Sequence, residues 1–206
     1  MARALAGGSR RHLKVYTRGG DQGASSLFNG ERRHKDDLAF AALGDADELN
    51  AAVGLARAHC AASPLLSPLP SQLELAQSRL IDLGSALATP LSTSNAAQRE
   101  RAAFDAEGGE ARQLEEWIDW MEERLPPLRT FILPSGGLAS ASLHVARATC
   151  RRAERSVVPL IQQKECPESV GVFLNRFSDY LFVSARYAAM RTDGGEVPYQ
   201  KARPST

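Results

Sequence analysis

Residues 143–160 read LHVARATCRRAERSVVPL, and residues 173–190 read FLNRFSDYLFVSARYAAM. In both stretches apolar residues return every three or four positions, which is the period of an amphipathic helix. The first apolar stripe comprises Leu143, Ala146, Cys150, Ala153, Val157 and Leu160, and the second comprises Val170, Leu174, Phe177, Leu181 and Ala185. Pro159 is expected to bend or end the first helix, and Pro167 to open the second. Two long amphipathic helices therefore dominate the second half of the chain.

Three further helices are predicted by the same periodicity over residues 36–59, 71–87 and 114–125. The sequence Ser71-Gln72-Leu73-Glu74 fits a capping box at the start of the middle one. The proline-rich segment 63–70, Pro90 and the pair Pro126-Pro127 separate these helices. Residues 91–109 are polar and are expected to form a surface loop, and no strand pattern rises above the helical one. The predicted fold class is all-α: a five-helix up-and-down bundle preceded by a glycine-rich loop.

The composition excludes several classes of protein. The chain has 206 residues, of which 43% are apolar, and its net charge is +1. This apolar content excludes global disorder, and the near-neutral charge gives no general attraction to nucleic acid or acidic membrane. No apolar run approaches the roughly 18 residues that span a bilayer. The three cysteines form neither a disulfide framework nor a zinc motif, which favours a reducing compartment.

The first 20 residues contain five basic residues and no acidic one. Such a start is typical of an organelle transit peptide, and a flexible terminus gives the same composition. We therefore expect residues 1–13 to be a flexible basic terminus or a presequence remnant. Residues 14–191 are expected to form the helical domain, and residues 192–206 a flexible tail.

The loop TRGGDQGASS (17–26), together with Lys35, has the composition of a phosphate-binding cradle. Glycines let backbone amides point at an anion, hydroxyl groups add donors, and a lysine balances charge. The loop does not match GxxxxGK[ST] and does not join a strand to a helix. A solvated turn remains the alternative.

A stronger signal is the arginine-rich face of residues 144–155. At about 100° per residue, Arg147, Arg151 and Glu154 share one narrow arc, with His144 and Arg155 beside it. Like charges at this spacing repel each other and need an anionic partner. A bound polyphosphate, a structural ion-pair network and plain solvation all remain open.

Two smaller polar groups accompany this face. Asn175 and Asp179 lie one turn apart on the last helix, where they either orient a ligand or hold two helices in register. Asp45, Asp47 and Glu48 crowd together and need a cation, either a metal or an arginine of the helix over 143–160. No histidine pair has zinc-ligand spacing, and no catalytic nucleophile with its base stands out.

Four blocks together resemble the PduO-type ATP:cob(I)alamin adenosyltransferases, and among them the animal mitochondrial members most closely. The blocks are YTRGGDQGASSLFNGERRHKDD (16–37), LGDADELNAAVG (43–54), FILPSGG (131–137), and the two helical stretches quoted first. The similarity runs from about residue 14 to residue 191. It implies a homotrimer with active sites between neighbouring subunits.

The resemblance also implies roles for individual residues. ATP would be bound by Thr17, Arg18, Gly19, Gly20, Ser25, Ser26, Lys35, Arg151, Arg152, Ala153, Glu154, Arg155 and Asn175. Catalysis would depend on Arg151, Arg152, Arg147 and Asp47, with Arg147 pairing across the interface, most simply with Asp47. Asp179 would support the arginines, and Phe131 would face the corrin ring. Mg²⁺ would be held mainly by the ATP phosphates rather than by a protein metal site.

The implied reaction transfers the 5′-deoxyadenosyl group of ATP to cob(I)alamin and releases triphosphate. The implied partners are ATP, cobalamin, further copies of the chain, and possible downstream mutase and upstream reductase proteins, with no nucleic acid and no membrane. The implied location is the mitochondrial matrix, or the cytoplasm if the chain is bacterial. A non-catalytic carrier of adenosylcobalamin and a ligand-free helical scaffold are the alternatives.

Overall fold

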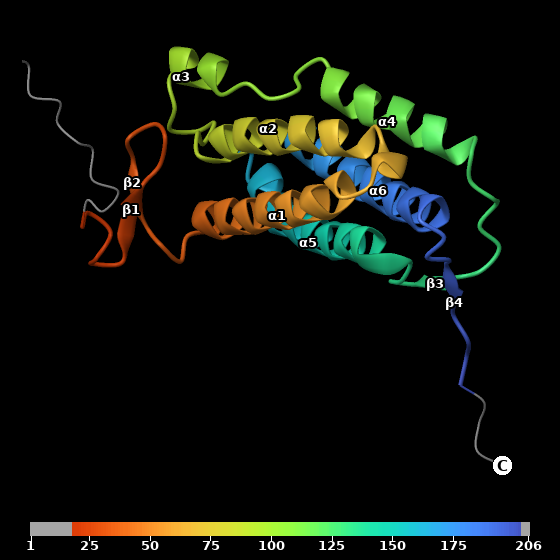
Figure 1. Ribbon diagram of the computed structural model, residues 1–206. Coiled ribbons are helices and arrows are strands. Elements are labelled where there is room, and N and C mark those ends of the chain that lie inside the picture. The colour runs from red at the N-terminus through yellow and green to blue at the C-terminus, as the bar shows by residue number, and fades with distance from the viewer. Residues whose placement is uncertain (1–17, 203–206) are drawn as a thin grey trace, which may run out of the picture.

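The computed structural model describes residues 18–202 and is mostly helical (Figure 1). The six α-helices are α1 (Leu38–Ala61), α2 (Leu69–Leu87), α3 (Ala96–Arg101), α4 (Gly109–Glu122), α5 (Gly137–Gln162) and α6 (Glu168–Arg191). A short 3-10 helix, η1 (Pro64–Leu66), joins α1 to α2. Four short strands complete the described residues: β1 (Ala24–Ser26), β2 (Arg32–His34), β3 (Ile132–Leu133) and β4 (Val197–Pro198).

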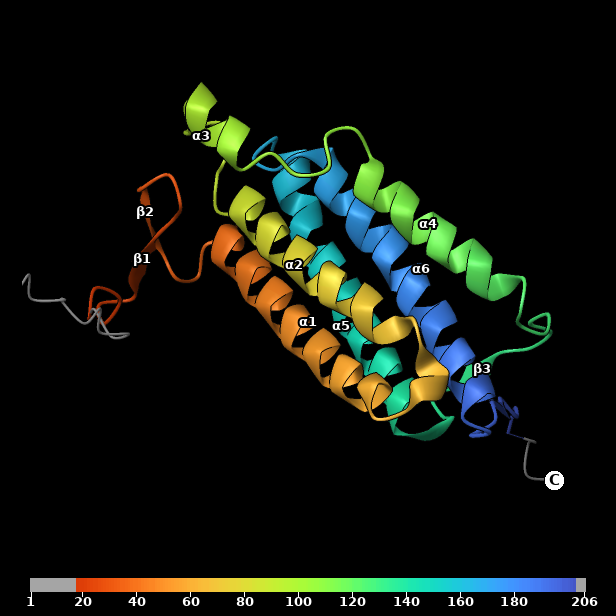
Figure 2. The same cartoon turned by 45° about the horizontal axis from the view of Figure 1, so that its top comes forward.

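The long helices form a bundle in which α5 packs against both α1 and α6, α2 covers α1, and α4 covers α6 (Figure 2). The predicted stripes are its core: every residue from Leu143 to Leu160 on the α5 stripe is buried. The rings of Phe173, Phe177 and Tyr180 stack in succession along α6. The five predicted helices and the bundle class are confirmed. Among residues 18–202, no helix is both long and apolar enough to cross a membrane.

Several element boundaries differ from the sequence predictions. Helix α2 begins at Leu69 without a side-chain cap, because the Ser71 hydroxyl donates to the Pro68 carbonyl instead of forming a capping box. The expected loop 91–109 contains α3, whose capping box is made by Asn95 and Gln98. Pro159 lies inside α5 and does not end it, since the helix continues to Gln162.

The described residues also contain two small antiparallel sheets that the sequence did not predict. Strands β1 and β2 form a hairpin that stands off one end of the bundle, whereas β3 and β4 pair at the opposite end (Figure 1).

Part of the tail that was expected to be flexible is held in the second of these sheets. The Tyr199 amide donates to the Phe131 carbonyl at 2.8 Å, next to the β3–β4 pair. A Cβ on Gly194 would lie 2.5 Å from the Gly136 carbonyl oxygen, so only glycine allows this close approach.

Candidate active site

A hollow of about 350 Å³ opens between α5, α6 and the segment that leads into β3. It brings together residues from three predicted groups: Phe131, the pair Arg147 and Arg151, and Asp179. The other residues that line it are Leu128, Ile132, Pro134, His144, Ser178 and Phe182. Phe131 is 82% exposed, the highest value among the exposed large apolar side chains of residues 18–202.

The cations of this hollow come from one face of α5. Arg147 and Arg151 are four residues apart, and the Arg147 guanidinium lies 5.9 Å from the centroid of the Phe182 ring. The Nε atom of Arg147 is buried and has no hydrogen-bond partner among the described residues. Asp179 faces them from α6, where its carboxylate pairs with Arg176 at 3.3 Å. The hollow thus combines an aromatic wall with guanidinium groups, which suits a large apolar ring system beside an anion.

His144, which was predicted to lie beside the arginine arc but was given no individual role, is also a member of this site. Its side chain is 5% exposed and meets the Phe182 ring edge-on, with 6.0 Å between the ring centroids. Burial lowers the pKa of His144, and the nearby Arg147 charge lowers it further. The neutral imidazole is therefore favoured. Spacing was the only available signal, because His144 and Phe182 each lie three residues from a predicted site residue.

Arg152 faces away from the hollow and binds α1. Its Nε donates to Asp45 at 2.8 Å, and it also pairs with Glu48. Ser156 donates a further hydrogen bond to Asp45. The prediction that an arginine neutralises this acidic cluster is confirmed. Asp47 is exposed and makes no ion pair within residues 18–202.

Of the remaining candidates on α5 and α6, Asn175, Glu154 and Arg155 make polar contacts, whereas Ala153 lies in the core. The Asn175 amide donates to Glu154 at 2.9 Å and so links the two helices. The Arg155 guanidinium donates to the Arg151 carbonyl. Ala153, in contrast, is fully buried in the core, so its side chain cannot contact a ligand in the hollow.

The glycine loop lies at the end of the β1–β2 hairpin opposite to its turn, just before β1 begins and beside the end of β2. Lys35 reaches back over this loop, since a Cβ on Gly20 would lie 3.1 Å from the Lys35 Nζ atom. The Arg32 guanidinium donates to the Gly19 carbonyl at 3.0 Å, and the Lys35 amide donates to the Gly23 carbonyl at 2.8 Å. The Lys35 ammonium group therefore lies over glycine backbone that no side chain shields. This arrangement suits the binding of a phosphate group.

Other predicted residues of the loop are placed only in part. Ser25 and Ser26 lie on β1, and Arg18 has a left-handed backbone conformation with φ 58°. Thr17 lies outside the described residues.

Comparison with known proteins identifies the kind of protein that carries these features. Residues 15–188 match the sequence model of the cobalamin adenosyltransferase family. The chain belongs to this family.

Its relatives in this family include animal and bacterial enzymes. The chain is 50% identical over 188 residues to the corrinoid adenosyltransferase MMAB of Bos taurus, which covers 91% of this chain and 76% of that protein. It is 37% identical over 190 residues to the corrinoid adenosyltransferase of Bacillus subtilis, with coverage of 92% and 94%. The predicted family and its enzyme class are confirmed.

A solved structure of the same family has the same fold. A variant of the PduO-type ATP:corrinoid adenosyltransferase from Lactobacillus reuteri, complexed with cobalamin and ATP, matches with a TM-score of 0.82 and 35% identity. The match covers 91% of this chain and 100% of that chain.

This cobalamin adenosyltransferase also has a second hollow, of about 390 Å³, between α2 and the segment joining α3 to α4. Of its two cations, Arg79 and Arg101, Arg79 is already paired with Asp82 at 2.9 Å and with Glu110 at 3.6 Å. Asp105 and Glu107 line the hollow as well, so acidic side chains outnumber the cations and make it a poorer anion site than the one beside Phe131. Within residues 18–202, no group of three or more His, Cys, Asp or Glu side chains could hold a metal ion.

Proposed function

We propose that this chain transfers the 5′-deoxyadenosyl group of ATP to the cobalt of cob(I)alamin. In this reaction a cobalt–carbon bond forms at the ribose C5′, the C5′–oxygen bond breaks, and triphosphate leaves with the bonding electron pair. No protein nucleophile is needed, because reduced cobalt supplies both electrons. Family membership and the relative complexed with cobalamin and ATP support this assignment.

One observation carries the proposal: the hollow beside Phe131 holds an aromatic wall and two arginines in one place. Phe131 and Phe182 offer apolar surface to a corrin ring, and Arg147 and Arg151 offer charge to the leaving triphosphate. Stabilising negative charge as it develops is commonly the largest single contribution to catalysis. Holding cobalt in line with C5′ supplies a further contribution, of roughly 7–11 kcal/mol for well-oriented reactants.

Residues 19–35, which we call the nucleotide arm, would hold the phosphates of ATP. Lys35 over the Gly20 backbone, with Ser25 and Ser26 on β1, gives the cradle its cation and hydroxyl groups. The predicted residues Arg151, Glu154, Arg155 and Asn175 would complete the nucleotide site from α5 and α6. Mg²⁺ would enter with ATP and share the phosphate charge with these cations, since its main ligands would be phosphate oxygens.

Phe131 would form the wall beneath the corrin ring. Its side chain is almost fully exposed, and the neighbouring backbone is fixed by the β3–β4 pair. An apolar side chain at the lower axial position excludes water and other ligands from cobalt. Loss of the lower axial ligand makes Co(II) easier to reduce to Co(I). Phe131 would therefore favour formation of the Co(I) nucleophile.

A homotrimer with sites between copies fits the placement of the arm. The arm stands off one end of the bundle, whereas β3, which directly follows Phe131 in the chain, lies at the other end (Figure 2). Arg147 is the eleventh of the 26 residues of α5, so it lies in the half of that helix that begins beside β3, away from the arm of the same copy. In a trimer, the arm of one copy would cover the arginines of its neighbour. Arg147 would then pair with the exposed Asp47 across the interface.

The decisive experiment is an anaerobic assay with the purified chain, ATP, Mg²⁺, cob(II)alamin and a strong reductant. Spectral conversion to adenosylcobalamin supports the enzyme. Binding of adenosylcobalamin without conversion would support a carrier, and no response at all would support a scaffold. Arg57→Ala, which removes an exposed ion pair between α1 and α2, is a matched arginine control.

The cellular setting follows from the chemistry of the reaction. It consumes Co(I), so a reductase would supply the electron, and its product would pass to an adenosylcobalamin-dependent mutase. The basic, acid-free start of the sequence supports a location in the mitochondrial matrix. Fractionation of cells that express the full chain tests this location.

A further inference from the structure

The nucleotide arm touches the bundle at the end opposite to its glycine loop. At the hairpin turn Leu27 is buried, and the Phe28 amide donates to the Ala88 carbonyl at 2.9 Å, just after α2. The glycine loop lies at the far end of both strands and projects away from the bundle (Figure 1). The direction of the loop is therefore set where the turn is attached.

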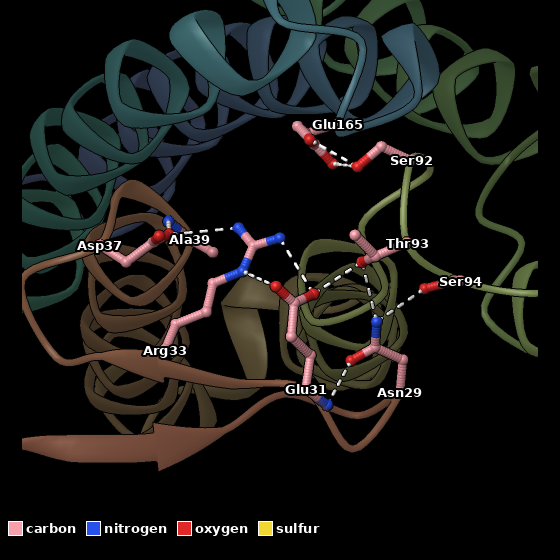
Figure 3. Close-up of polar contacts among 9 residues, drawn as sticks. All are labelled: Asn29, Glu31, Arg33, Asp37, Ala39, Ser92, Thr93, Ser94 and Glu165. Atoms are coloured by element: carbon pink, nitrogen blue, oxygen red, sulfur yellow. Dashed lines mark hydrogen bonds and ion pairs between the residues drawn. The ribbon is translucent and has the colours of Figure 1, made fainter.

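The attachment is a network of polar side chains between the turn and the segment that joins α2 to α3 (Figure 3). The Thr93 hydroxyl donates to the Glu31 carboxylate at 2.6 Å, and it accepts a hydrogen bond from the Asn29 amide at 3.1 Å. The Asn29 side-chain amide also donates to the Ser94 hydroxyl, and the backbone carbonyl of Asn29 accepts a hydrogen bond from the Gln98 side chain. Both the donor and the acceptor of Thr93 are thus used to hold the hairpin.

The network continues to the start of α1. Glu31 accepts two hydrogen bonds from Arg33, at 2.9 and 3.1 Å, and these together with Thr93 lower the pKa of Glu31 to about 2. Arg33 lies 3.5 Å from Asp37, which caps α1 by accepting from the Ala39 amide. The hairpin is consequently fixed on two sides, by Thr93 after α2 and by Asp37 before α1.

We propose that Thr93 is a positioning residue for the nucleotide: through Glu31 it sets the angle at which the arm presents its glycine loop. The segment that sequence analysis assigned to a surface loop would then support the ATP site. This inference rests on the proposed binding of ATP by the arm.

The length of the arm makes this angle important. Glu31 and Lys35 are four residues apart in extended chain, which is about 13 Å. A tilt of about 10° at the attachment would move the loop by about 2 Å, and misplacement of about 1 Å can cost on the order of a hundredfold in rate. A residue that never touches ATP can therefore change its binding.

The test compares Thr93→Val with Thr93→Ser in the full chain. Valine keeps the shape but removes the hydroxyl, and we expect the KM and Kd for Mg-ATP to rise about tenfold or more. The KM for cob(I)alamin should change less than about twofold, since in the proposed trimer the arm would contact the phosphates of ATP and not the Phe131 and Phe182 rings that would face the corrin. Serine keeps the hydroxyl and should restore the ATP values to within about twofold.

The matched control is Ser92→Ala. The Ser92 hydroxyl lies in the same segment but donates to Glu165 at 2.7 Å and not to the hairpin. This variant should leave the KM for ATP unchanged. If Thr93→Val raised both KM values equally, or if Ser92→Ala matched it, the effect would be general loosening of the segment and the proposal would be overturned.

Failure of this inference is distinguishable from failure of the proposed function. If Thr93→Val bound ATP normally while Lys35→Ala lost it, the arm would bind ATP without help from Thr93. If Lys35→Ala and Arg151→Ala both retained normal ATP affinity, the nucleotide site itself would be misplaced. A double variant, Glu31→Gln with Thr93→Val, adds a third check, because residues that act through one contact show non-additive effects.

Discussion

Replacing Glu196 with alanine should destabilise the fold through a buried cation on α6. The Arg186 side chain is only 6% exposed, and its Nε donates to Glu196 at 2.7 Å. Its second contact is a hydrogen bond to the Pro126 carbonyl at 2.8 Å. The variant would leave the guanidinium buried beside one neutral acceptor.

The structure allows the size of this effect to be worked out. Breaking a buried ion pair costs about 3–5 kcal/mol. Because the Glu196 side chain is 25% exposed, water can reach the vacated position, and we expect a loss of about 2–3 kcal/mol in the free energy of unfolding. At about 2–4 °C per kcal/mol for a chain of this size, Tm should fall by about 4–12 °C.

Glu115→Ala is the matched control on the same helix. Arg176 donates to Glu115 at 2.8 Å, but these side chains are 34% and 48% exposed. Exposed pairs contribute about 0–1 kcal/mol, so this Tm should fall by no more than about 4 °C.

Both variants should be measured by thermal unfolding at one protein concentration, because assembly makes Tm concentration-dependent. Glu196→Gln should fall between wild type and Glu196→Ala, since its amide oxygen still accepts a hydrogen bond. Equal shifts for Glu196→Ala and Glu115→Ala would refute the reasoning from burial.

Three further variants test the candidate site. Arg151→Ala should reduce kcat/KM by roughly 10²–10³ in the adenosylation assay while Tm and assembly stay unchanged; full activity, as in the control Arg57→Ala, would remove its role at the triphosphate. Phe131→Ala should keep ATP binding but lose the spectrum of four-coordinate Co(II), and an unchanged spectrum would count against the wall. Burial and Arg147 lower the pKa of His144 below its usual 6.5, so the stability that its neutral form contributes is present above pH 6.5 and lost as pH falls. His144→Gln should reduce that acid-side loss, and Tm curves parallel to wild type between about pH 7.5 and 5 would contradict it.

The long helices could be predicted from the sequence because burial imposes a period on them. The apolar stripe from Leu143 to Leu160 marks the face of α5 that packs on α1 and α6. Helix α3 was not predicted because it has no buried residue and therefore no apolar stripe. Its capping pair, Asn95 and Gln98, was the one local signal available.

The short strands could not be predicted for a different reason. Strands β3 and β4 have two residues each and are separated by more than 60 residues. Two residues cannot show an alternation, and their pairing depends on where α6 returns the chain. The hairpin β1–β2 is likewise specified by its contacts with Ala88 and Thr93 more than by its own composition.

The sequence predicted which charged residues belong to the candidate site, but it did not predict which acidic residue each arginine pairs with. Helical spacing correctly grouped Arg147 with Arg151, since residues four apart are about 40° apart around the axis. The same rule places Arg152 about 100° from Arg151, but only the packing shows that this direction meets Asp45 on α1. Sequence spacing gives the direction in which a side chain leaves its helix, but it does not identify the helix or residue that it meets in that direction.

This division of charges explains why α5 can carry its arginines without an internal acid for each. Asp45 and Glu48 offset the charge of Arg152 on α1, and this contact holds two helices of the bundle together. Arg176 offsets the acidic side chain that faces the hollow from α6. Arg147 and Arg151 therefore have no acidic ion-pair partner within residues 18–202 of the same copy, and both line the hollow. The packing that stabilises the bundle thus also leaves the hollow with the positive charge that the proposed triphosphate site requires.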